Sequence, residues 1–120
     1  SKTFTPGPDE RIGWGAIGFN IQLDGKSIVN LGDTLLHEKE WQSIKNPDVL
    51  MIPIGGRDYH NTMDEKEAIM QPKRVIPCHY NCPAFFSRKI NPADDKLFKA
   101  AVEKMNIKCV ILQKNDSIGV

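Results

Sequence analysis

Two short, nearly unbroken apolar runs constrain the fold of this chain most strongly. DVLMIPI at residues 48–54 and RVIPC at residues 74–78 are short for a helix and lack the alternation of a half-exposed strand. Such runs are typical of parallel strands that are covered on both faces. A segment with helical character lies between them, and units of this kind build a parallel sheet. We therefore predict an α/β fold.

An antiparallel hairpin is predicted in front of these strands. Residues 16–23 alternate between apolar and other side chains, as in a strand with one buried face. Asp24-Gly25 forms a strong hairpin turn signal, and residues 27–31 supply the returning strand. Because the hairpin is antiparallel and the later strands are parallel, the predicted sheet is mixed.

Helices are predicted between the strands, and one more strand follows the last of them. The first helix ends before Pro47, which restricts the residue in front of it. The second begins with the capping-box spacing of Thr62 and Glu65, and the third can begin at Asn91-Pro92, because proline is tolerated in the first turn of a helix. The predicted helices cover residues 37–45, 63–71 and 93–105, and the predicted strand covers residues 108–113.

The length and composition favour a single domain. The chain has 120 residues, of which 40% are hydrophobic, and this is enough to bury a core. Residues 1–15 contain prolines and glycines without periodicity, so we expect an extended arm there. Residues 16–120 then form one αβ unit.

Charge and cysteine content exclude several functional classes. The 16 basic and 15 acidic residues form no run of either sign, so no nucleic-acid partner is expected, and a small, near-neutral substrate or a protein surface is favoured. No apolar stretch approaches the ~20 residues that span a membrane, and the start of the chain lacks the pattern of a signal peptide. Three cysteines in such a chain favour reduced thiols, and we expect a cytoplasmic protein.

Three loops that follow predicted strands carry polar residues that a structural turn does not need. They are Gly32-Asp33-Thr34, residues 55–63, and residues 79–83. Because the carboxyl ends of parallel strands lie at one edge of a sheet, these loops are expected to meet there. A carboxylate from Asp33 and an imidazole from His79 form a ligand set suited to zinc, iron or manganese.

Four motifs, in this order, resemble a known family. GFNIQLDGKSIVNLGDT, DVLMIPIGG, TMDEKEA and KRVIPCHYN are similar to the C-terminal half of metal-dependent hydrolases of the metallo-β-lactamase superfamily. The resemblance covers residues 13–120 and is strongest to a branch related to lactonases and N-acylphospholipid phosphodiesterases. It implies half of a four-layer αββα sandwich, with a mixed β-sheet and helices on one face.

The resemblance also implies a catalytic metal site. Asp33 corresponds to the aspartate that bridges two metals, and His79 to the histidine that completes the second metal site. Both are therefore expected to be catalytic metal ligands. The expected metal is zinc, with manganese or iron as alternatives. Metal-activated water would then attack an ester, a lactone or a phosphodiester.

The family's H-x-H-x-D-H motif is absent from this chain. The histidines are His37, His60 and His79, and no two of them lie two residues apart. We therefore expect weak or no metal binding and no activity from the chain alone. The missing partner is the N-terminal half of the fold or a second copy of the chain, as in a dimer. The alternative is a non-catalytic binding or assembly module that retains the half-fold.

Other residues at the same edge are candidates for contact with substrate or with the metal ligands. A solvent-exposed loop position is favoured for His60, and an exposed position at a helix start for His37. The candidates for substrate contact or for support of the ligands are Thr34, Gly55, Gly56, His60, Tyr80 and Asn81.

The sequence Cys78-His79-x-x-Cys82 also resembles a zinc knuckle. Strand alternation turns Cys78 away from His79, and a knuckle needs a second ligand pair that the sequence lacks. We favour small core residues for Cys78 and Cys109, and an exposed loop thiol for Cys82.

Overall fold

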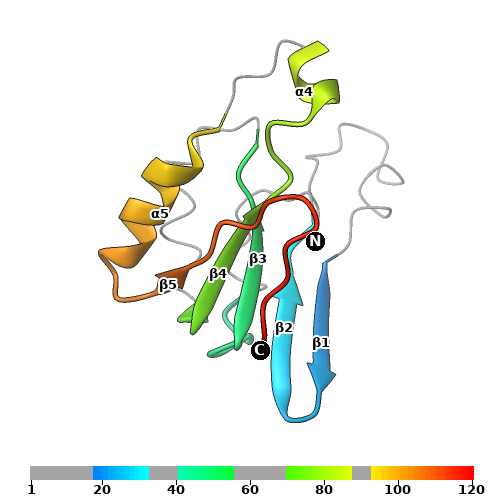
Figure 1. Ribbon diagram of the computed structural model, residues 1–120. Coiled ribbons are helices and arrows are strands. Elements are labelled where there is room, and N and C mark those ends of the chain that lie inside the picture. The colour runs from blue at the N-terminus through cyan, green and yellow to red at the C-terminus, as the bar shows by residue number, and fades with distance from the viewer. Residues whose placement is uncertain (1–17, 33–40, 56–69, 88–92) are drawn as a thin grey trace, which may run out of the picture.

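The computed structural model describes residues 18–32, 41–55, 70–87 and 93–120 (Figure 1). Within these ranges a mixed sheet carries one well-formed helix, α5, beside its parallel half. The strands are β1 (Phe19–Leu23), β2 (Lys26–Asn30), β3 (Val49–Pro53), β4 (Arg74–Cys78) and β5 (Lys108–Cys109), and the helices are α4 (Pro83–Ser87) and α5 (Asp95–Glu103). The predicted arm at residues 1–15 lies outside the described residues.

The strands follow chain order across the sheet. β1 pairs with β2 in the antiparallel sense, and β2, β3, β4 and β5 are parallel to one another. Figure 1 shows β2, β3 and β4 pointing the same way and β1 pointing back. This arrangement confirms the predicted mixed sheet. It also places the ends of β2, β3 and β4 at one edge, which we call the rim.

The hairpin turn forms where the sequence predicts it. Asp24 and Gly25 have φ values of 50° and 74°, so both central residues take the left-handed conformation that a two-residue hairpin favours. The turn sets the register of the hairpin, in which Ile21 lies opposite Ile28.

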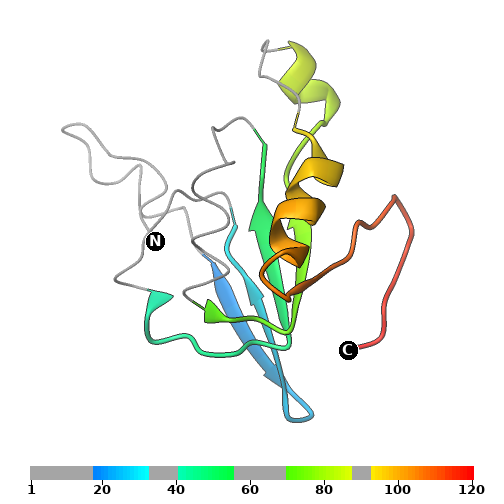
Figure 2. The ribbon, with the colours of Figure 1, turned by 90° about the vertical axis from the view of Figure 1, so that its left-hand side faces the viewer.

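The main core lies on one face of the sheet. Val29, Leu50 and Val75 occupy neighbouring register positions on three adjacent strands, and all three are buried. Phe98 and Val102 of α5 join the same cluster, so α5 packs on this face. Figure 2 places the C-terminal segment on the other side of the sheet from the segment that leads into β3.

The other face of the hairpin carries exposed apolar side chains. In β1, Phe19, Ile21 and Leu23 are 55%, 48% and 62% exposed. They alternate with polar residues and therefore point away from the face that bears Val29. We call these three residues the hairpin stripe.

The strands are confirmed more fully than the helices. The predicted strand at residues 108–113 is reduced to β5, although the Val110 backbone N–H still donates to the Val75 carbonyl at 2.9 Å. The helix predicted at 37–45 is helical at Trp41, its first described residue, and gives way to a turn by residue 42. There the Ile44 N–H donates to the Trp41 carbonyl at 2.9 Å.

Two further differences concern the segment after β4. Helix α4 was not predicted, although Pro83 suits the first turn of a helix. Helix α5 begins after Asp94, not with Pro92 in its first turn. The Asp94 carboxylate caps α5 by accepting a hydrogen bond from the Leu97 N–H at 2.9 Å, because free N–H groups at a helix start need acceptors. None of the helices in the described ranges has the length and apolar character needed to cross a bilayer.

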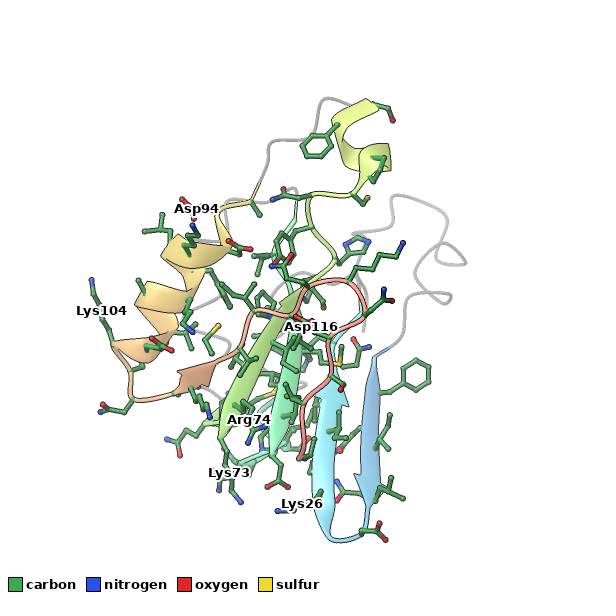
Figure 3. All side chains as sticks on the ribbon, viewed as in Figure 1. Lys26, Lys73, Arg74, Asp94, Lys104 and Asp116 are labelled. Carbon is green, nitrogen blue, oxygen red and sulfur yellow. The ribbon has the colours of Figure 1, made fainter. Side chains whose placement is uncertain are left out.

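One carboxylate links β2 to the residues that lead into β3 and β4, at the end of the sheet opposite the rim. The Asp48 carboxylate accepts hydrogen bonds from the Ser27 N–H at 2.8 Å and from the Lys73 ammonium at 3.0 Å. These contacts, with the Ser27 bond as the larger cause, lower the pKa of Asp48 below its ordinary value. Figure 3 shows Lys73 at this end of the sheet with Lys26 and Arg74.

Replacing Phe98 by alanine tests the core. Phe98 is 2% exposed, and the Phe98→Ala change is expected to lower the free energy of unfolding by about 3–5 kcal/mol through lost burial and a residual cavity. Leu97→Ala, at a neighbouring position that is 49% exposed, is the control and is expected to change it by less than about 1 kcal/mol. Urea unfolding measures both. Equal effects would contradict the packing of α5 described above.

Replacing Asp48 by asparagine tests the bridge between the strands. Because the folded pKa of Asp48 is lowered, its ionised form stabilises the fold above the unfolded pKa near 3.8, and this contribution disappears as pH falls through the folded pKa. Asp48→Asn is expected to destabilise the protein at pH 7, with a smaller difference from the wild type at pH 3. Urea midpoints at both pH values measure this, with Asp24→Asn at the exposed turn as control. A pH-independent difference would contradict the bridge.

Candidate metal centre at the rim

The rim is built by the parallel strands, whose hydrogen bonds continue past their ends. The Leu31 N–H donates to the Met51 carbonyl, and the Ile54 N–H donates to the Cys78 carbonyl, each at 3.1 Å. One residue further on, the Gly55 N–H donates to the His79 carbonyl at 3.1 Å. The structure therefore brings Gly55 and His79 side by side, as expected from their places after β3 and β4.

His79 has an unusual backbone conformation for a residue with a side chain. Its φ is 53°, in the left-handed region, and its side chain is exposed. Such a conformation costs about 1–3 kcal/mol and persists where the surroundings hold it, often at functional sites. At His79 the ladder ends and the chain turns away from the sheet, so the imidazole is presented at the rim rather than within the core.

Cys78 differs from its neighbour His79 in both burial and chemistry. Cys78 is half-buried, and burial raises the pKa of its thiol to about 11. A metal ligand must be the thiolate, which this environment disfavours at neutral pH. Among the described residues, which include Cys78, His79 and Cys82, no three potential ligands form a cluster that would hold a metal. The structure thus gives no support to the zinc-knuckle alternative.

The other two cysteines differ in burial. Cys109 is buried in the core, as predicted, and Cys82 is half-buried. Neither forms a disulfide in this structure, and the reduced state of the thiols stays a prediction.

Tyr80 points toward the core from between two residues with left-handed backbones. Its ring packs against the buried cluster, and its hydroxyl donates to Asp95 Oδ2 at 3.0 Å. Burial, followed by the hydrogen bond to Asp95, raises the pKa of Tyr80 to about 12, so the hydroxyl stays protonated. In this structure the hydroxyl is committed to Asp95, and contact with a substrate stays a prediction.

Asn81 attaches the loop after β4 to the segment that precedes α5. Its Nδ2 donates to the Ala93 carbonyl at 2.9 Å, and its Oδ1 accepts from the Ala93 N–H at 2.8 Å. Asn81 also has a positive φ of 50°. Figure 3 shows Asp94, the next residue after Ala93, at the end of α5 nearer the rim. The observed role of Asn81 is therefore to hold this loop.

The structure brings some of the predicted site residues together and leaves others untested. Gly55, His79, Tyr80 and Asn81 form one continuous group at the ends of β3 and β4. Gly32 lies at the end of β2 on the same rim, directly before Asp33 in the sequence. The predicted site residues outside the described ranges are Asp33, Thr34, Gly56 and His60.

Sequence reasoning did not find the partners that support this group. Ala93 and Asp95 hold Asn81 and Tyr80, but no motif links positions that far apart in the chain. A weaker signal was present, because histidine and asparagine adopt the left-handed conformation more often than most residues. The sequence His79-Tyr80-Asn81 after a buried strand is compatible with the sharp turn that the structure shows.

Comparison with known proteins gives consistent results. Residues 4–79 match the model of a family described as the beta-lactamase superfamily domain. The "UPF0173 metal-dependent hydrolase" of Natranaerobius thermophilus is 36% identical over 111 residues, which cover 86% of this chain and 46% of that protein. The protein of the same name from Methanoregula boonei is 39% identical over 111 residues, covering 83% of this chain and 46% of that protein.

A solved structure shows the same likeness. Igni18, described as a novel metallo hydrolase from Ignicoccus hospitalis, superposes with a TM-score of 0.69 and 29% identity, over 84% of this chain and 44% of its own. The chain thus spans about half the length of the relatives that it matches. The fold is α/β and corresponds to part of the fold of these neighbours. With its order of motifs, its mixed sheet and the matching family model, the chain belongs to the metallo-β-lactamase superfamily.

Proposed function

We propose that the chain is the C-terminal part of a metal-dependent hydrolase in which Asp33 and His79 are metal ligands. The observation that carries the proposal is the position of His79, exposed at the rim with a strained backbone held by Gly55. The names of the relatives, metal-dependent hydrolase and metallo hydrolase, support the reaction class.

Under this proposal, the described residues would supply only part of a metal site. His79 offers one imidazole nitrogen, and Gly32, at the end of β2, directly precedes Asp33. Imidazole and carboxylate are suited to zinc and also to manganese or iron. Because a stable zinc site takes three or four protein ligands, the remaining ligands are proposed to come from the other half of the fold.

The proposed reaction is hydrolysis of a small ester, lactone or phosphodiester. When bound, a divalent metal supplies a hydroxide at neutral pH by lowering the pKa of a coordinated water toward ~7. His79 contributes a nitrogen lone pair to hold the metal, and the Gly55 N–H fixes the His79 carbonyl at 3.1 Å. Tyr80 and Asn81 are proposed to support this geometry from below the rim through Asp95 and Ala93.

The hairpin stripe is proposed to be covered by the remaining half of the fold. Phe19, Ile21 and Leu23 form an apolar row on a sheet whose other face already carries the core. Apolar sheet faces of this kind mark interfaces. The relatives are about twice as long as the matched segment, which provides the chain needed to cover it. A second copy of this chain is the alternative occupant.

The metal-ligand proposal is tested by removing Asp33 and His79 in the protein that contains the rest of the fold. Asp33→Ala and His79→Ala are each expected to reduce bound zinc and hydrolysis of model esters and phosphodiesters by at least about a hundredfold, because ligand loss exceeds the usual effect of changing a supporting residue. His37→Ala is the matched control and is expected to retain both.

Native mass and metal analysis complete this test. A wild-type protein without bound metal, together with partner binding that survives the double substitution of Asp33 and His79 by alanine, would contradict the hydrolase and favour a binding module. Metal content that depends on Asp33 and His79 would favour the hydrolase.

The hairpin stripe is tested with two variants that introduce the same residue on opposite faces. The chain alone is expected to self-associate at micromolar concentration, and Leu23→Glu is expected to shift it toward monomer by placing a charge on the stripe next to Lys26. Gln22→Glu, on the opposite face, is expected to leave association unchanged. Sedimentation velocity measures both, and a wild-type chain that is monomeric at 100 times that concentration would count against the proposal.

A further inference from the structure

We infer that Asn81 is a positioning residue for His79, because its side chain ties the loop after β4 to the start of α5. The inference rests on the proposed function, in which His79 is a metal ligand. It assigns Asn81 a role that acts through the backbone of its neighbour and requires no contact with metal or substrate.

The tie uses both polar atoms of the Asn81 side chain. Nδ2 donates to the Ala93 carbonyl at 2.9 Å, while Oδ1 accepts from the Ala93 N–H at 2.8 Å. Two opposed hydrogen bonds to one residue fix the plane of the amide as well as its distance. Ala93 is itself 7% exposed and belongs to the core cluster, so packing fixes the position of the residue to which Asn81 binds.

His79 is also held by the segment that follows β3. Its carbonyl accepts the hydrogen bond from Gly55, and its φ of 53° turns the chain out of the sheet. A strained backbone of this kind persists only when the surrounding structure determines it from more than one direction. Gly55 provides one constraint on His79. Asn81, which lies two residues after His79, provides the other.

Tyr80 adds a second tie that is less specific. Its hydroxyl donates to Asp95 at 3.0 Å, but its ring also packs against the core cluster. The ring contacts would remain after the hydroxyl is removed. Asn81 is exposed and is held by its amide contacts, so its loss is expected to release the loop more completely.

The test replaces Asn81 by glycine. Glycine takes positive φ freely, so Asn81→Gly removes the tie without forcing the backbone into a new conformation. Asn106→Gly is the matched control, because Asn106 has a φ of 61° and lies two residues after Lys104, which Figure 3 shows at the end of α5 far from the rim. Asn81→Asp keeps the oxygen that accepts from the Ala93 N–H and is the partial rescue.

Two measurements on the full chain report on position separately from stability. Hydrogen exchange at the Gly55 N–H follows its bond to His79, and the coupling between the His79 amide and α protons follows φ. Asn81→Gly is expected to speed Gly55 exchange at least tenfold and to alter the His79 coupling. Asn106→Gly is expected to leave both unchanged, and Asn81→Asp to fall between them.

A Zn²⁺ titration of the protein that contains the rest of the fold, observed at the imidazole signals, connects position with ligation. Zn²⁺ is expected to shift the His79 signal in the wild type, with about tenfold weaker apparent binding in Asn81→Gly, the size expected when the support of a ligand is lost. His37 provides the internal reference.

The outcomes separate the inference from the proposed function. Unchanged Gly55 exchange and His79 coupling in Asn81→Gly would overturn the positioning role. If Asn81→Gly does not fold, wild-type values of Gly55 exchange and of the His79 coupling in Asn81→Asp would overturn it instead. Zn²⁺ that leaves the wild-type His79 signal unmoved would contradict the proposed metal ligand, while the exchange data would still decide the tie.

Discussion

The parallel pairing of β3 with β4 is the constraint on which the rest of the structure depends. It begins with Leu50 opposite Val75 in the core and continues past the strands to the hydrogen bond between Gly55 and His79. Core packing on one side of the sheet therefore fixes the register of the rim. A shift of one residue would move Leu50 out of the core and His79 away from Gly55 at the same time.

The same pairing explains how a stable sheet carries a strained residue. Most residues of β3 and β4 are buried, so local relaxation at His79 would have to break well-packed structure. The positive φ values at His79 and Asn81 bring the chain off the sheet in two steps, with Tyr80 turned inward between them. The side chain that is presented at the rim is thus selected by backbone geometry, before any ligand is considered.

Much of the fold was predictable because its signals are local. The apolar runs that became β3 and β4, and the Asp24-Gly25 turn, are determined by neighbouring residues. The start of α5 was predicted too early. The sequence offers both Pro92 and Asp94 as helix-start signals, and the structure uses Asp94 as the N-cap. The tie from Asn81 to Ala93 was missed because tertiary packing, which no periodicity encodes, brings the two together.

For the site, the sequence predicted which residues meet at the rim, but not the contacts of Tyr80 with Asp95 and of Asn81 with Ala93 that support them. His79 and Gly55 were expected to meet because strand ends converge, and they do. One physical explanation accounts for both the apolar hairpin stripe and the small number of ligand donors on the described part of the rim. A sheet with one packed face and one partly open face has room for a second layer, and a layer that buries Phe19, Ile21 and Leu23 lies against the same sheet that ends in His79. Completing the core and completing the ligand set are therefore proposed to be one event, which would couple metal binding to the stability of the assembled fold.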